Sequence, residues 1–230
     1  MKKYRLTEET TKVGNRPLYR IQALRDFGNV KEGDIGGYIE SEKNLSQDGN
    51  AWVSGDARVS GNAWVSGDAW VSGDARVSDN AWVYGNARVS DNAWVYGNAR
   101  VSGDAWVYGD AWVYGDACVS GDACVYGDAR VYGDARVSGN ACVYGNARVY
   151  GNADIKTTGD ICSMSGFGSE YRTTTAFRTK NGDVHVSCGC FFGSLEAFCQ
   201  RVESTHGNNL YGREYKKMIE MLKIHFEVEP

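Results

Sequence analysis

The sequence predicts a mostly β protein built as a parallel β-solenoid and followed by a small α+β module. The first observation is a six-residue repeat that runs through nineteen units from Gly49 to Cys162, with the pattern Gly, Asp or Asn, Ala, a variable residue, Val, and Ser or Tyr; Gly holds the first position in sixteen units, and Asp79, Asp91 and Thr157 are the exceptions. Short repeats bury their apolar side chains only by stacking on one another. The second observation is that Ala and Val stand two apart, as residues on one side of a strand do. The third is the Gly–Asp/Asn pair, which supplies the backbone angles of a tight corner.

Residues 1–48 are expected to form an N-terminal cap and the first coil. Leu18–Ile21 and Tyr38–Ile39 are short strand-like pieces, and turn-forming glycines lie between them. Ile39 and Leu45 are six apart, so the coil can begin before the regular repeat, whereas Leu45 and Val53 are eight apart. This spacing predicts a two-residue insertion at the first corner. A cap is needed because the first turn of a solenoid otherwise exposes an unpaired strand edge.

Within residues 49–162, the inward positions predict a narrow core of β-branched and small side chains. Val recurs from Val53 to Val149 and is followed by Ile155 and Ile161, while Ala fills the second inward position. The unit Val53-Ser54-Gly55-Asp56-Ala57-Arg58 resembles the hexapeptide repeat of left-handed parallel β-helix proteins. The resemblance implies a left-handed triangular solenoid with three hexapeptides per turn, hence about six rungs at the ~4.8 Å strand spacing. Members of that family are commonly trimeric.

Residues eighteen apart are then expected to stack, which sorts the outward side chains into three faces. Two faces become rich in tyrosine toward their C-terminal halves, and the third stays mostly serine. The second face is predicted to be a ligand-binding or interface surface, formed by Arg58, Arg76, Trp94, Trp112, Arg130 and Arg148 with the tyrosine ladder Tyr96, Tyr114, Tyr132 and Tyr150. On the first face, the predicted interface residues are Trp52, Trp70, Trp106, Tyr108, Tyr126 and Tyr144. So many outward aromatic and arginine side chains favour self-association, with a trimer as the expected oligomer.

The composition changes at residues 163–230, where the pattern predicts a ββαα module. Asn181-Gly182 is typical of a two-residue hairpin turn between Thr173–Thr179 and Val184–Cys190. That register would place Cys188 and Cys190 on the face of Val186 and Phe177, with His185 on the other face. Ser194 can cap a helix that ends near Gly207, and a second helix carries an apolar stripe from Tyr211 to Phe226.

The distribution of histidine argues against the chemistry for which hexapeptide-repeat enzymes are known. An acyltransferase of that kind needs a histidine general base on the solenoid, yet residues 49–162 contain no histidine. An acyltransferase is therefore the weakest alternative, with His185 or His206 as an unusual base. No Cys-x-x-Cys pair is present, and turn chemistry explains the corner aspartates, so no metal and no cofactor are expected.

The net charge of −4 makes nucleic acid an improbable partner, and no apolar run is long enough to span a membrane. Seven cysteines without a secretory signal fit the cytoplasm. Leu18–Gly28, Gly33–Glu40 and Cys188–Phe198 are similar to segments of bacteriophage and prophage hexapeptide-repeat proteins, which would place the chain in an infected bacterial host. We expect a non-enzymatic scaffold that self-associates and binds a host or phage protein. The alternative is a protein that sequesters a small anionic metabolite or nucleotide.

Overall fold

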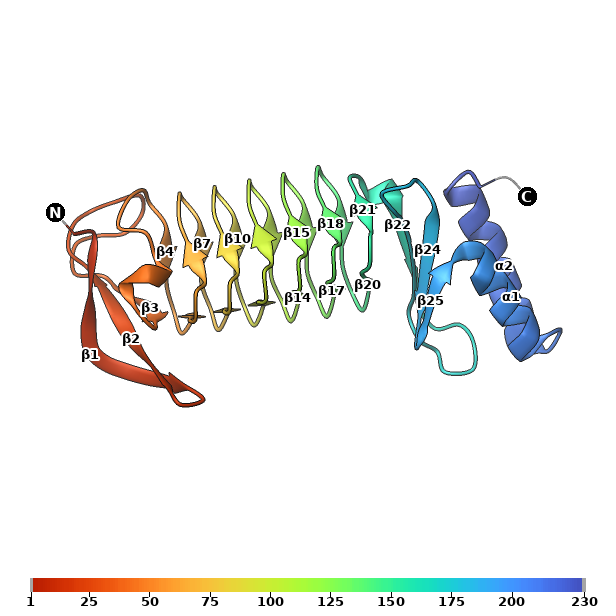
Figure 1. The fold of residues 1–230 in the computed structure, drawn as a ribbon, viewed down its shortest axis with the longest axis horizontal. Coiled ribbons are helices and arrows are strands. Elements are labelled where there is room, and N and C mark those ends of the chain that lie inside the picture. The colour runs from red at the N-terminus through yellow and green to blue at the C-terminus, as the bar shows by residue number, and fades with distance from the viewer. Residues whose placement is uncertain (1, 229–230) are drawn as a thin grey trace.

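The computed structural model describes residues 2–228 and shows a rod with a cap at each end (Figure 1). The rod is a parallel β-solenoid of about seven turns, one more than the repeat length predicted. The additional turn arises because coiling begins at Tyr38–Ile39, which pairs in parallel with Arg58–Val59 ahead of the regular repeat. In this part of the chain, no helix is long and apolar enough to cross a membrane.

The N-terminal cap consists of an antiparallel hairpin and a strand that leads into the solenoid. Strands β1 (Tyr4–Val13) and β2 (Arg16–Ala23) form the hairpin, and β3 (Ile35–Ile39) pairs with β2 before η1 (Glu42–Asn44). Strand β1 was not predicted. The predicted two-residue insertion is confirmed, because Leu45 bridges to Val65 twenty residues later rather than eighteen.

Each face of the solenoid is a ladder of two-residue strands whose partners are eighteen residues apart. The first face contains β4 (Trp52–Val53), β7 (Trp70–Val71), β10 (Arg88–Val89), β13 (Trp106–Val107), β16 (Cys124–Val125) and β19 (Cys142–Val143). The second contains β5 (Arg58–Val59), β8 (Arg76–Val77), β11 (Trp94–Val95), β14 (Trp112–Val113), β17 (Arg130–Val131) and β20 (Arg148–Val149). The third contains β6 (Trp64–Val65), β9 (Trp82–Val83), β12 (Arg100–Val101), β15 (Cys118–Val119), β18 (Arg136–Val137) and β21 (Asp154–Ile155). The predicted sorting into three faces is confirmed.

The interior is filled by the alanine and valine columns, all of which are buried. At the corners, the first position has a positive φ, which glycine adopts without steric cost. Asp79 and Asp91 occupy this conformation with φ of 59° and 58°. Their carboxylates accept the N–H groups of Gly97 and Gly109 in the next turn at 3.2 and 3.1 Å, which offsets part of the backbone strain.

The C-terminal module is an antiparallel sheet between the end of the solenoid and two helices (Figure 1). It comprises η2 (Thr158–Asp160), β22 (Ile161–Met164), β23 (Thr174–Arg178), β24 (Val184–Cys188), β25 (Phe191–Ser194), α1 (Leu195–His206) and α2 (Leu210–His225). Phe177 joins the solenoid core, whereas Ala176 and Val186 pack with the helices. Ser194 caps α1 by accepting the N–H of Ala197, and Gly207 ends that helix, as predicted.

The predicted two-residue hairpin turn in this module is wrong by one residue. Thr179 N–H donates to the Asp183 carbonyl and Gly182 N–H to the Thr179 carbonyl, so Lys180–Gly182 form a three-residue loop with Gly182 at a φ of 85°. Phe177 therefore pairs with His185 rather than with Val186. A shift of one residue in the pairing register moves every side chain of a strand to the opposite face of the sheet. Phe177 and His185 therefore lie on the same face. Cys188 packs with the helices on the opposite face, and Cys190 is exposed.

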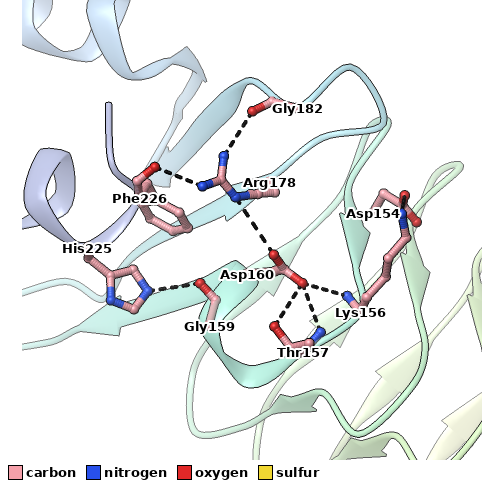
Figure 2. A network of polar contacts seen from close by, with 9 residues as sticks. All are labelled: Asp154, Lys156, Thr157, Gly159, Asp160, Arg178, Gly182, His225 and Phe226. Atoms are coloured by element: carbon pink, nitrogen blue, oxygen red, sulfur yellow. Dashed lines mark hydrogen bonds and ion pairs between the residues drawn. The ribbon is translucent and has the colours of Figure 1, made fainter. Parts of the chain in front are cut away.

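A polar network closes the solenoid onto this module (Figure 2). One Asp160 oxygen accepts the N–H groups of Lys156 and Thr157 at 3.0 and 2.8 Å and the Thr157 hydroxyl at 3.0 Å. The other lies 3.7 Å from Arg178 Nε, while the Arg178 guanidinium also donates to the carbonyls of Gly182 and Phe226. Burial acts to raise the pKa of Asp160, but these donors and Arg178 outweigh it and lower the pKa below the usual 3.8.

Candidate functional site

The outer side of the second face carries what we call the arginine–aromatic strip: Arg58, Arg76, Trp94, Trp112, Arg130, Arg148, Tyr96, Tyr114, Tyr132 and Tyr150. Its centre is one continuous stack. Trp94 and Trp112 are parallel within 8° with ring centroids 5.1 Å apart. The Arg76 guanidinium lies 4.6 Å from the Trp94 centroid and that of Arg130 lies 4.9 Å from the Trp112 centroid, so a cation covers each end of the tryptophan pair.

The tyrosine ladder runs beside this stack. Successive rings from Tyr96 to Tyr150 are stacked with centroids 4.9, 4.8 and 4.5 Å apart. Phe192 of β25 continues the ladder at 4.1 Å from Tyr150. Burial, followed by the neighbouring phenols of Tyr150 and Tyr114, raises the pKa of Tyr132 to about 12. Tyr132 is therefore uncharged at neutral pH, and the ladder presents a row of stacked rings.

The strip arginines are not neutralised by acidic side chains. Among residues 2–228, Arg58, Arg76, Arg130 and Arg148 have no carboxylate within ion-pair distance. Two of them use tryptophan faces instead, and the buried Nε of Arg58 has no hydrogen-bond partner. The strip is thus a positively charged column on a chain that is acidic overall.

The first face differs from expectation at its N-terminal end. Trp52 is only 2 % exposed, because the edges of Tyr4 and Phe27 from the cap pack on it at 6.4 and 5.4 Å. Trp52 lies on the outer side of the first face in register with Trp70, but the cap covers it, so it is not available as the predicted interface residue. Trp70 is half-buried against the core, whereas Trp106 is exposed and stacks with the Arg88 guanidinium at 5.0 Å.

The remaining predicted residues of the first face form a second, shorter ladder. Tyr108, Tyr126 and Tyr144 are stacked with centroids 5.0 and 5.5 Å apart. Sequence reasoning passed over Trp82 and Tyr84 on the third face, although both are exposed. Trp82 is the register partner of Trp64, and the Arg100 guanidinium lies 5.9 Å from the Trp82 ring centroid, so the third face carries a short aromatic group and no tyrosine ladder.

The three histidines all lie in the C-terminal module. His185 meets the Phe192 ring edge-on at 5.3 Å, and its buried Nδ1 has no partner. His206 stacks on Tyr215 at 5.6 Å, and His225 Nε2 lies 3.0 Å from the Gly159 carbonyl. None of them projects from a face of the repeat, where a general base of the acyltransferase type would be needed.

The cysteines are free, and Cys124 and Cys142 are register partners on the first face. Burial, and then the neighbouring thiol of Cys142, raises the pKa of Cys124, which keeps its thiol protonated at neutral pH. Over the described range, no cluster of three or more His, Cys, Asp or Glu side chains could hold a metal ion.

Comparison with known protein families gives matches within the six-residue repeat and not in the N-terminal cap or the C-terminal module. Six segments match the family described as the YdcK Beta solenoid repeat, at residues 51–67, 69–85, 81–97, 93–109, 123–139 and 129–145. All of them lie inside the solenoid and together cover less than half of the chain. A search of curated proteins gave no match. The chain is thus a β-solenoid repeat protein whose function must be argued from its surfaces.

Proposed function

We propose that this protein is a non-enzymatic scaffold that self-associates through the arginine–aromatic strip and binds a further protein. The observation that carries the proposal is the Arg76–Trp94–Trp112–Arg130 stack on a flat, regular face. The resemblance of Leu18–Gly28, Gly33–Glu40 and Cys188–Phe198 to segments of phage and prophage proteins favours a phage origin and action in the cytoplasm of the infected host. The partner is then a host or phage protein.

The strip suits an interface because its side chains are already immobilised. Binding orders flexible side chains at a cost of about 0.5–1.5 kcal/mol each, and rings held in ladders avoid much of that cost. Trp, Tyr and Arg are also the residues that contribute most to protein–protein affinity. Trp94 and Trp112 are each half-buried by their neighbours, so a partner completes their burial rather than creating it.

The distribution of charge favours a cyclic trimer of this chain. Arginines occupy the strands of the strip, whereas aspartates such as Asp110, Asp116 and Asp134 occupy exposed corners of the same solenoid. Two strips facing each other would set arginine columns against arginine columns. A strip that meets the corner of the next copy instead pairs opposite charges, and a head-to-tail contact of this kind can close into a ring.

The test is the mass in solution of single tryptophan variants, measured by size-exclusion chromatography with multi-angle light scattering. Trp94→Ala and Trp112→Ala should convert a trimer to monomers at micromolar concentration, because interface tryptophans contribute about 2 kcal/mol or more each. Trp82→Ala is the matched control, since Trp82 is an exposed repeat tryptophan on the third face. The proposal fails if the wild-type chain is a monomer or if the strip variants keep the wild-type mass.

The unpaired arginines also favour the second candidate, a protein that sequesters a small anionic metabolite or nucleotide. Guanidinium groups without carboxylate partners bind phosphate readily, often through two parallel hydrogen bonds. A panel of nucleotides in a thermal-shift assay tests this candidate, and it requires stabilisation by at least one of them. It does not depend on the oligomeric state.

A further inference from the structure

The C-terminal end of the strip opens into a cavity of about 550 Å³ between the solenoid and the end module. Asn146 and Arg148 line it from the last turns of the solenoid, and Tyr171, Arg172 and Gly189 line it from the module. These residues are far apart in the sequence, so the cavity forms only because β23 packs against β20. The Arg148 N–H donates to the Thr175 hydroxyl at 3.2 Å and holds the two parts in register.

The Arg172 guanidinium lies beside the Gly189 backbone at the wall of this cavity. A Cβ on Gly189, which has a φ of 60°, would lie 2.6 Å from Arg172 Nη1, so the absent side chain leaves the space that the guanidinium occupies. The loop that carries Arg172 is anchored at Gly168, whose N–H donates to Glu214 of α2 at 2.9 Å. The Arg172 side chain remains 53 % exposed, so its guanidinium is accessible to a ligand in the cavity.

The charge of the cavity is positive. Arg172 has one ion-pair partner, Glu170 at 3.7 Å, and Arg148 has none within residues 2–228. Two guanidinium groups thus line one cavity with a single carboxylate to balance them. Paired guanidinium groups match the charge and the oxygen geometry of a phosphoryl group.

An aromatic ring completes the site. Tyr171 is 68 % exposed at the cavity and has a φ of 50°, a conformation that costs a non-glycine residue about 1–2 kcal/mol. Its ring offers a free face on which a base can stack. The volume falls within the range of about 300–1,000 Å³ that is typical of small-molecule sites.

We propose that this cavity binds a phosphorylated small molecule of the nucleoside monophosphate class. Arg148 and Arg172 bind the phosphoryl group, and the ring of Tyr171 stacks on the base. The proposal deepens the second candidate function and assigns it a site, and it does not rest on self-association.

The experiment is isothermal titration calorimetry of the full-length chain with adenosine monophosphate, inorganic phosphate and adenosine. Adenosine monophosphate should bind more tightly than either of its parts. Arg172→Gln should weaken that binding about tenfold or more, because it removes hydrogen bonds to a charged group. Gly189→Ala should weaken it as well, since the new methyl group displaces the Arg172 guanidinium.

Arg136→Gln is the matched control, because Arg136 holds the same repeat position on the third face, is exposed and lies outside the cavity. It should bind as the wild-type chain does, and Trp112→Ala should also bind normally whatever its oligomeric state. Absence of adenosine monophosphate binding up to about 10 mM overturns the proposal. An equal loss of affinity in Arg136→Gln overturns it too, because it would show non-specific attraction to charge.

Discussion

At the residue scale, the solenoid depends on corners whose first residue has a positive φ and lies against the corner of the next turn. At Gly103, φ is 68° and an added Cβ would lie 2.9 Å from the backbone nitrogen of Gly121. At Gly145, φ is 62° and nothing lies within 4 Å of that position. A side chain at position 145 would therefore meet backbone strain alone, whereas one at position 103 would meet backbone strain and also contact the next turn.

We predict that Gly145→Ala lowers the free energy of unfolding by about 1–2 kcal/mol, which is the cost of the left-handed backbone alone. Gly103→Ala should cost more, because the backbone of the next turn must also move. Urea denaturation followed by circular dichroism compares the two variants. Equal losses of unfolding free energy in the two variants would show that a Cβ at one corner does not press on the backbone of the next turn.

Lys3 gives a second prediction at this scale. Its side chain is buried in the N-terminal cap, with Nζ 2.8 Å from the Ala51 carbonyl and 5.1 Å from the Phe27 centroid. Burial, and then repulsion from Arg25, lowers its pKa from 10.5 to about 8. The folded chain thus releases this proton at a lower pH than the unfolded chain, so stability should increase as the pH rises from about 8 toward 10.

The measurement is the free energy of unfolding at about pH 7.5 and pH 9.5, compared between the wild-type chain and Lys3→Met. The wild type should gain on the order of 1–3 kcal/mol relative to that variant across the interval. Lys2→Met serves as the control, since the Lys2 side chain is 60 % exposed and should keep the wild-type slope. A slope that survives in Lys3→Met would contradict the assignment.

For most of the repeat, the sequence pattern could predict which outward side chains are exposed. It could not do so for Trp52. Alternation places Trp52 and Trp70 alike on the first face, because both occupy the same position of the six-residue unit. The burial of Trp52 comes from Tyr4 and Phe27, whose packing depends on how a non-repeating cap folds back. A periodic pattern carries no information about such a contact.

At the element scale, Asp160 joins the last coil to the sheet of the C-terminal module (Figure 2). Asp160→Asn should lower the free energy of unfolding by about 1–3 kcal/mol, because it removes hydrogen bonds to a charged acceptor. The folded pKa is depressed, so this contribution is present above 3.8 and is lost as the pH falls through the folded value. In thermal melts, the difference between the two proteins should therefore be smaller at about pH 3 than at about pH 6.

Asp154→Asn is the control for that measurement. Its carboxylate pairs with Lys156 at 3.0 Å, and although the Asp154 side chain is only 18 % exposed, the Lys156 side chain is 68 % exposed to solvent. Ion pairs with a solvent-exposed partner contribute about 0–1 kcal/mol. Within residues 2–228, Asp154 also lacks the backbone donors that Asp160 has, so this variant should lose less stability than Asp160→Asn. A larger loss in Asp154→Asn than in Asp160→Asn would contradict the role given to Asp160.

The sheet of the end module shows what local sequence can predict about an element. Asn181-Gly182 correctly predicted a hairpin, and Ser194 and Gly207 correctly predicted the limits of α1. The loop length could not be predicted, because Gly182 is compatible with both a two-residue turn and a three-residue loop with a bulge. Packing of Phe177 into the solenoid and of Val186 against the helices selects the observed register.

At the scale of the whole molecule, the strip follows directly from an eighteen-residue repeat, whereas the cavity at its end does not. Arg148 belongs to the strip by its position, but its proximity to Arg172 depends on the packing of β23 on the last turn. No sequence repeat relates Arg172 to Arg148, so their proximity could not be predicted. The left-handed winding implied by the hexapeptide resemblance stays a prediction, since right-handed crossovers are the general rule for parallel strands.

The most direct test of self-association through the strip is native mass spectrometry of the wild-type chain, with Trp112→Ala measured beside it. We predict a mass about three times the 25.2 kDa of one chain for the wild type and a single-chain mass for the variant. A wild-type spectrum that contains only single chains, or a variant that keeps the trimer mass, would contradict the account.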